Sequence, residues 1–156
     1  MKCISILQPW ASLVALGHKR IETRSWNTKY RGELLIHASK KKPTDPYLYD
    51  TLHDIATNAG LIRNWSELPY GAIIGKVNLN AVVDVESFLA FPVGYYGDHR
   101  YELTEQELAF GDYSPNRFGW LLSDPILFKE PIPCKGQLGI WNLPAELEEL
   151  IINQNK

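Results

Sequence analysis

Short apolar runs, interrupted by proline, glycine and charged residues, make up most of this 156-residue chain. Residues 2–7 are apolar and β-branched, which is typical of a strand, and the pair Gln8-Pro9 ends the run. Pro9 suits the first turn of a helix and Gly17 suits the position after the last turn. The beginning of the chain therefore predicts a strand followed by a short helix.

Strict alternation of polar and apolar positions marks the next segment, residues 19–26 (KRIETRSW). This period of two predicts a strand with one strongly polar face. That face carries Arg20, Glu22, Arg24 and Trp26. Residues 32–39 (GELLIHAS) follow, and their unbroken apolar run indicates a strand that is buried on both faces.

The rest of the chain predicts more strands than helices. We expect a helix over 46–60, a long strand or strand pair over 71–85, two strands over 118–133 that are broken near Asp124-Pro125, a short strand over 139–144 and a closing helix over 144–151. Residues 86–117 predict a long loop with one short helix over 104–111. About six strands with short helices between them predict a small mixed β-barrel of the α+β class, in a single domain spanning residues 1–156.

Charge is distributed unevenly although the net charge is only −2. Residues 18–42 hold eight basic and two acidic side chains, a local balance of +6, whereas residues 43–156 have a balance of −9. This asymmetry is a reason to consider a polyanionic partner that contacts one face, and charge alone is equally compatible with a solvated surface whose sign varies by chance.

Several protein classes are excluded by what the sequence lacks. No apolar run reaches the roughly 20 residues of a membrane span, and the N-terminus lacks the pattern of a signal peptide, so we expect a cytoplasmic protein. Cys3 and Cys134 have no metal-ligand spacing and are expected to be free thiols. The scattered histidines predict no metal site, and no phosphate-binding or dinucleotide fingerprint predicts a cofactor.

The polar face of residues 19–26 is the main candidate for chemistry. A carboxylate next to cations stays ionised, so we expect Glu22 to be held by Arg24 and by Lys19, which reaches in from the beginning of the strand. Trp26 offers a surface on which a base can stack. The alternative is a ladder of exposed ion pairs, each worth well under ~1 kcal/mol.

The segment QPWASLVALGHKRIETRSWNTKYRGELLIHASKKKP resembles the signature of the ASCH domain family, including a G-x-K-x-x-E-x-R core at Gly17, Lys19, Glu22 and Arg24. The similarity resumes at GAIIGKVNL and at FGWLLSDPILFKEPIPCKGQLGIW. This resemblance implies a PUA-like fold, a small β-barrel with a helix at its mouth. It also implies a cleft lined by the core motif that binds RNA, DNA or a nucleotide.

Three functions remain open at this point. The resemblance implies a module that binds nucleic acid or a modified nucleotide, without a cofactor. The second function is a small amidohydrolase acting on an N4-acylated cytidine-type nucleoside, because some relatives in the superfamily have that activity. In that interpretation Lys19 matches a catalytic lysine, Glu22 replaces the usual threonine, and Asp84 or Glu86 stands near the place of a later glutamate. The third is a protein-interaction domain whose basic face binds an acidic partner.

The candidate residues follow from these interpretations. The catalytic candidates, if the protein is an enzyme, are Lys19 and Glu22. The candidates for contact with a nucleic acid or nucleoside are Gln8, Pro9, Trp10, Lys19, Arg24, Ser25, Trp26, Arg31, Lys40, Lys41 and Lys42. The expected partners are RNA, single-stranded or duplex DNA, or a modified nucleoside, and no membrane.

Overall fold

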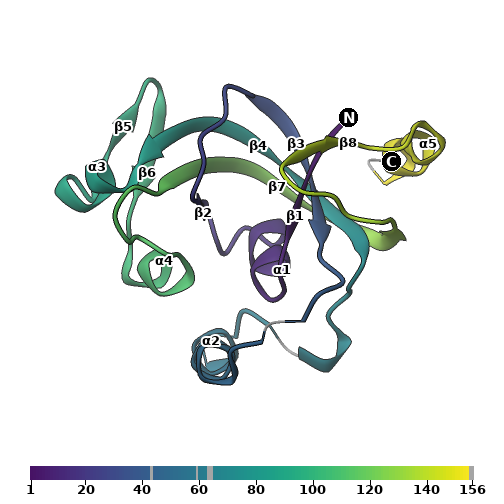
Figure 1. Ribbon diagram of the computed structural model, residues 1–156, viewed down its shortest axis with the longest axis horizontal. Coiled ribbons are helices and arrows are strands. Elements are labelled where there is room, and N and C mark those ends of the chain that lie inside the picture. Colours follow the sequence, from purple (N-terminus) through teal and green to yellow (C-terminus); the bar gives the residue numbers. More distant parts are fainter. Residues whose placement is uncertain (43, 59, 63–64, 155–156) are drawn as a thin grey trace.

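A mixed six-stranded sheet curls into a half-barrel, and short helices surround it (Figure 1). The computed structural model describes residues 1–42, 44–58, 60–62 and 65–154. The sheet order is β2-β7-β4-β3-β1-β8, and only the β1–β3 pair is parallel. The strands are β1 (Lys2–Ile6), β2 (Ile21–Arg24), β3 (Gly32–Ala38), β4 (Ala72–Asp84), β7 (Phe118–Pro133) and β8 (Ile140–Asn142). The expected α+β class is therefore confirmed.

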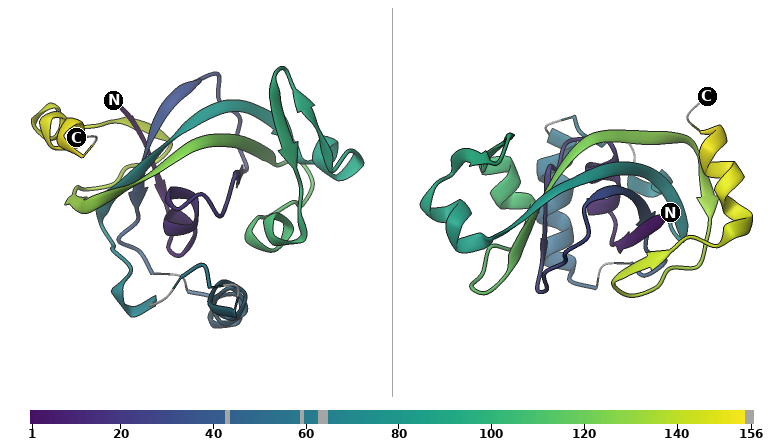
Figure 2. Two further views of the ribbon diagram at one scale, coloured as in Figure 1. Left: turned by 180° about the vertical axis from the view of Figure 1, so that it is seen from behind. Right: turned by 90° about the horizontal axis from the view of Figure 1, so that it is seen from above.

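Helix α1 (Trp10–Ala15) lies on the concave side of the curled sheet and contacts β3, β4 and β7 (Figures 1 and 2). Its buried residues Ala11, Val14 and Ala15 join the main core, which the inward side chains of the strands complete. Gly75 on β4 makes the close approach possible, because a Cβ there would lie 2.4 Å from the Ile126 carbonyl oxygen and 3.0 Å from the Ala15 Cβ. The helix thus packs close to the sheet because the small residue Ala15 meets a glycine.

The other helices lie at the two ends of the curled sheet or beyond α1 on its concave side (Figures 1 and 2). Helix α2 (Pro46–Asn58) packs through Leu52 and Ala56 on Leu13 of α1. Among the described residues outside the region 85–117, the other helical elements are two 3₁₀ turns, Trp65–Glu67 and Ala145–Leu147, and the last helix α5 (Glu148–Asn153). No helix among the described residues has the length and apolarity to cross a membrane.

Residues 86–117 do not form the long loop that the composition predicts. They hold helix α3 (Val85–Ala90), a hairpin of β5 (Val93–Tyr96) and β6 (His99–Glu102), and helix α4 (Glu105–Phe110). Local capping explains the two helices, because Asp84 accepts a hydrogen bond from the Ser87 backbone N–H and Thr104 accepts one from that of Glu107. Only the second helix and its Thr104 cap are predicted by the sequence pattern.

The segment 118–133 is one continuous strand and not the expected pair. Asp124 adopts φ 52°, and the register with β4 shifts there, so that Ser123 pairs with Asn78 whereas Ile126 pairs with Lys76. Pairing with β4 resumes after the irregularity because the long partner strand continues past it. A bulge of this kind bends a strand without ending it, so the Asp-Pro break in the sequence marks a bend.

Candidate functional site

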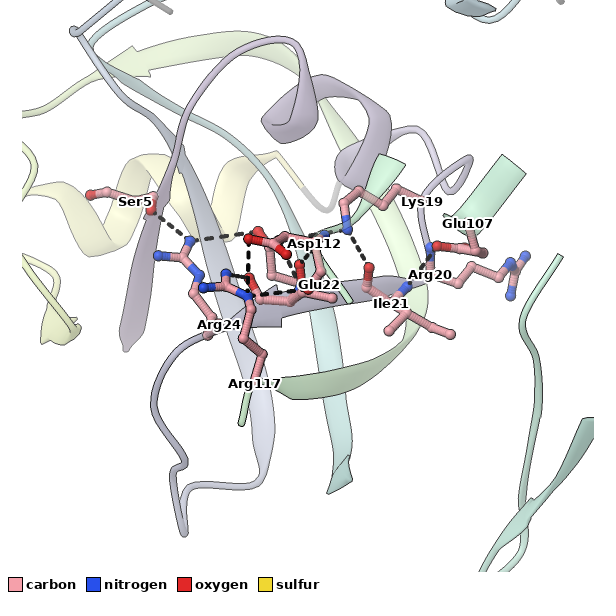
Figure 3. A network of polar contacts seen from close by, with 10 residues as sticks. Ser5, Lys19, Arg20, Ile21, Glu22, Arg24, Glu107, Asp112 and Arg117 are labelled. Carbon is pink, nitrogen blue, oxygen red and sulfur yellow. Dashed lines mark hydrogen bonds and ion pairs between the residues drawn. The ribbon is translucent and has the colours of Figure 1, made fainter. Parts of the chain in front are cut away.

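A buried carboxylate with two cationic neighbours lies on β2. Glu22 is only 7% exposed, and Lys19 and Arg24 lie on either side of it (Figure 3). The Lys19 Nζ is 3.6 Å from Glu22 Oε1, and the Arg24 Nη2 is 3.5 Å from Glu22 Oε2. Lys19 and Arg24 therefore both meet the carboxylate of Glu22, as the core motif predicts.

Lys19 reaches Glu22 although it lies outside the strand and out of its phase. The chain turns back after α1, where the N–H groups of His18 and Lys19 both donate to the Leu13 carbonyl at 2.9 and 3.0 Å. This turn directs the Lys19 side chain inward, so that it is 1% exposed and donates to the Ile21 carbonyl. Burial of an ammonium group is costly unless it is paired, and the Glu22 carboxylate supplies that pairing.

Arg24, on the edge strand β2, contacts β1, the fifth strand of the curled sheet. Its Nη2 donates to the Ser5 carbonyl at 2.9 Å, and Ser5 belongs to β1. Strands β2 and β1 are not neighbours in the sheet, since β7, β4 and β3 separate them. The guanidinium group therefore spans the open side of the half-barrel, and it does so while holding Glu22.

A pocket of about 750 Å³ opens beside this carboxylate. It extends between β2, the end of β1 and the segment that follows α4. We call it the tryptophan pocket, and its characteristic lining residues are Trp10, Glu22, Arg24, Trp26, Tyr113 and Arg117. Its volume is in the usual range of about 300–1,000 Å³ for small-molecule sites, and its wall combines aromatic surface with both signs of charge.

Residues 111–117 form the far wall of the tryptophan pocket and are fastened to Thr23 of β2. The Asp112 N–H donates to Thr23 Oγ1 at 2.9 Å, and the Arg117 guanidinium donates to the Thr23 carbonyl at 3.3 Å. Arg117 also pairs with the Asp112 carboxylate at 3.5 Å. The Tyr113 hydroxyl is buried without a hydrogen-bond partner among the described residues, and burial, followed by the charges of Glu107 and Glu22, raises its pKa.

Glu107 on α4 secures the beginning of β2. The residue is 5% exposed, and its carboxylate accepts hydrogen bonds from the backbone N–H groups of Arg20 at 2.6 Å and Ile21 at 3.4 Å (Figure 3). Burial raises the pKa of Glu107, while these hydrogen bonds and the charge of Lys19 act in the opposite direction. Because Glu107 fixes the backbone next to Lys19, it positions the ion-paired cluster without lining the tryptophan pocket.

The sequence interpretation missed Glu107, Asp112, Tyr113 and Arg117. All four lie in the region 86–117, which carried no motif. The only available signal was the predicted helix over 104–111 with its Thr104 cap. A helix with an apolar side has to pack against the rest of the protein, so residues near it could be expected to approach another element. The hydrogen-bond partners of Glu107, Asp112 and Arg117, at the beginning of β2 and on it, are 80 or more positions away along the chain. This separation has no periodic signature.

The predicted contact residues divide into two groups. One group lines the tryptophan pocket and consists of Trp10, Arg24, Ser25 and Trp26; the catalytic candidate Glu22 lines it as well. The remaining predicted contacts lie elsewhere, and the structure gives several of them other partners.

Gln8 is fully buried, and its side-chain amide donates hydrogen bonds to the Ser12 hydroxyl and the Pro69 carbonyl. These contacts give Gln8 a structural role. Pro9 is buried next to it at the beginning of α1. Arg31 is exposed, and its guanidinium donates to nearby backbone carbonyls. Residues 40–42 are exposed but do not line the tryptophan pocket.

Neither acidic residue considered as a later catalytic glutamate reaches the pocket lining. Asp84 caps α3, and Glu86 accepts a hydrogen bond from the Asn116 N–H at 2.8 Å. Within the part of the chain that the structure describes, no group of three or more His, Cys, Asp or Glu side chains is arranged to hold a metal ion.

Known proteins similar to this chain include animal and bacterial ones. The chain is 28% identical over 152 residues to activating signal cointegrator 1 of Homo sapiens and, equally, to that of Mus musculus, with 94% of this chain aligned. It spans only 23% of the length of these relatives.

A crystal structure of ASCH from Zymomonas mobilis has a TM-score of 0.56 and 17% identity, and covers 97% of this chain and 93% of its own. A crystal structure of the Y47F mutant of that protein has a TM-score of 0.54 and 19% identity, and covers 97% of this chain and 96% of its own. At such identities the likeness concerns the fold. The model of the ASCH domain matches residues 4–131, more than half of the chain, so the chain belongs to the ASCH domain family.

Proposed function

We propose that this protein binds nucleic acid or a modified nucleotide, with one base in the tryptophan pocket. The observation that carries the proposal is the position of Glu22, a buried carboxylate held between two cations in the wall of an aromatic-lined pocket. Unstacked bases are recognised by stacking on aromatic side chains and by hydrogen bonds to their edges. Trp26 supplies a stacking surface and Glu22 supplies acceptors for the N–H groups of a base.

Glu22 has acceptor capacity left for a ligand. An ionised carboxylate offers about four lone-pair sites. Glu22 Oε1 already accepts the Thr23 N–H at 3.0 Å, and the two ion pairs lie at 3.5 and 3.6 Å, longer than ordinary hydrogen bonds. Arg24 and Arg117 line the same pocket, and guanidinium groups suit phosphate oxygens through paired hydrogen bonds. Base and phosphate recognition are thus available side by side.

The basic stretch of residues 18–42 provides the first test. Simultaneous replacement of Lys40, Lys41 and Lys42 by Ala should weaken binding of a single-stranded oligonucleotide and flatten its salt dependence, by about 0.7 units of slope for each phosphate that the variant no longer neutralises. Fluorescence anisotropy at a series of salt concentrations measures both quantities. An unchanged affinity and slope would show that this face does not bind the phosphates.

The amidohydrolase is the second candidate, and the proximity of Lys19 to Glu22 favours it. A lysine ammonium 3.6 Å from a carboxylate at the edge of a pocket can serve proton transfer and charge stabilisation. In that mechanism Glu22 positions and deprotonates a water molecule, and Lys19 stabilises the oxyanion. Lys19 is, however, 1% exposed and outside the pocket lining, which favours binding over hydrolysis.

Turnover of N4-acetylcytidine separates the two candidates. If the site is hydrolytic, we expect release of acetate by the wild-type protein and its loss in Glu22→Gln, because the amide cannot take a proton from water. If the site only binds, the wild-type protein releases no acetate, and Glu22→Gln changes the preference among nucleosides. Binding of acidic peptides without any binding of oligonucleotides or nucleosides would instead favour a protein-interaction domain.

A further inference from the structure

A second pocket lies on the other side of β1 from the tryptophan pocket. It has a volume of about 720 Å³, and we call it the lysine pocket after Lys40 and Lys135, which line it together with Ser5, His37, Gly136 and Gln137. Ser5 lines both pockets. The two sites are therefore adjacent, with a single residue of β1 in the shared wall.

The charge of the lysine pocket has one sign. Its lining holds two lysines and no acidic side chain. Lys40 and Lys135 are exposed and take part in no ion pair with the residues that the structure describes. Burial is the main cause of the raised pKa of the Cys134 thiol, and the charge of Glu146 is the second cause. Glu146 therefore lies near Cys134, but it does not line the pocket. Unpaired ammonium groups in a concave site attract an anion.

A chain of hydrogen bonds links the residues in one wall of this pocket. The His37 Nε2 faces the Cys134 carbonyl at 2.7 Å, so it carries the proton and donates, and Nδ1 accepts from the Ser5 hydroxyl at 3.1 Å. The Trp141 indole donates to Ser5 Oγ at 3.2 Å. Burial lowers the pKa of His37, which is consistent with a neutral ring in this chain.

Gly136 brings the backbone of the following segment against this wall. A Cβ at that position would lie 2.6 Å from His37 Cε1 and 2.8 Å from Ser5 Oγ, so a larger residue would have to move away. The same close packing sets the place of the neighbouring Lys135 and Gln137, which line the pocket. One wall of the lysine pocket is thus closely packed, and the exposed lysines lie at its edge.

Ser5 couples the two pockets physically. Its carbonyl accepts the hydrogen bond from Arg24, which lines the tryptophan pocket, while its hydroxyl belongs to the chain in the wall of the lysine pocket. We infer that the lysine pocket binds a phosphate group of the strand whose base occupies the tryptophan pocket. This inference rests on the proposed function. It adds Lys135, which lies far from the basic stretch in sequence, to the path of the nucleic acid.

Charge variants of Lys135 test this assignment, with Lys129 as the matched control because it is an exposed lysine of the preceding strand that lines none of the pockets above. Binding of a ten-nucleotide single strand and of the free nucleosides is measured by anisotropy and by calorimetry. Lys135→Ala should lower the affinity for the oligonucleotide several-fold and reduce the salt slope by about 0.7. Lys135→Glu should lower the affinity further, and neither variant should change nucleoside binding.

The outcomes separate the inference from the proposed function. If the wild-type protein binds the oligonucleotide and the Lys135 and Lys129 variants behave alike, the phosphate subsite is wrong and the proposed function stands. If Lys135→Glu also loses nucleoside binding, the two pockets are not distinct subsites, and the assignment is overturned. If the wild-type protein binds anionic lipid vesicles through Lys135 but no oligonucleotide, both the subsite and the proposed function are wrong.

Discussion

Replacement of Glu22 by Ala is expected to lower the free energy of unfolding by about 3–5 kcal/mol, because it leaves the buried ammonium of Lys19 without its carboxylate. Lys19 is 1% exposed, and among the described residues it keeps the Ile21 carbonyl as a hydrogen-bond partner and the charge of Glu107 nearby in this variant. Removal of one member of a buried ion pair costs more than the pair contributes, since the remaining charge is uncompensated. Urea denaturation followed by circular dichroism measures the decrease.

Two further variants show whether burial is the cause. The double variant Lys19→Met, Glu22→Gln removes both charges and should recover most of this free energy. Glu33→Ala removes an exposed partner of Lys76, whose ion pair measures 2.8 Å, and should cost less than about 1 kcal/mol. Equal decreases in Glu22→Ala and Glu33→Ala would mean that the Lys19 ammonium reaches water, and the description of the cluster as buried would fail.

Replacement of Trp26 by Leu is expected to weaken oligonucleotide binding by about 1–3 kcal/mol, or roughly 5- to 150-fold in Kd, because the stacking surface for the base is removed. Trp26 is half-buried, and its ring meets that of Trp120 edge to face at 4.8 Å, which fixes the ring beside the pocket. Anisotropy of a labelled single strand measures the change, and thermal unfolding shows that the variant is folded.

The aromatic series provides the controls for Trp26. Trp26→Phe retains a ring and should retain most of the affinity, whereas a purely apolar role would make Leu and Phe equivalent. Tyr47→Ala removes an aromatic side chain that is 83% exposed on α2 and lines none of the pockets described above, so it should bind like the wild-type protein. Equal affinities of the wild-type, Leu and Phe proteins would exclude stacking on Trp26.

Local patterns in the sequence are sufficient to predict most helices and strands. They also predict the approach of Lys19 and Arg24 to Glu22. The alternation of residues 19–26 predicts β2, and Gly17 predicts the end of α1, because both depend on backbone preferences within a few residues. The approach of Lys19 and Arg24 to Glu22 is local as well, since all three lie within one turn and one strand. The same reasoning fails at Asp124-Pro125, where pairing with the long neighbour β4 overrides a local break signal.

The pocket itself depends on how the sheet curls. Because β2 pairs with β7, and Arg24 reaches Ser5 across the open side, residues of the non-adjacent strands β2 and β1 meet beside Glu22. Three residues far away in the sequence join this site by hydrogen bonds to Thr23 and to the backbone at the beginning of β2: Glu107, Asp112 and Arg117. These long-range contacts have no periodic signature in the sequence. Alternation therefore identifies which face of β2 is polar, but long-range pairing places that face in a cavity and leaves residues 40–42 outside it.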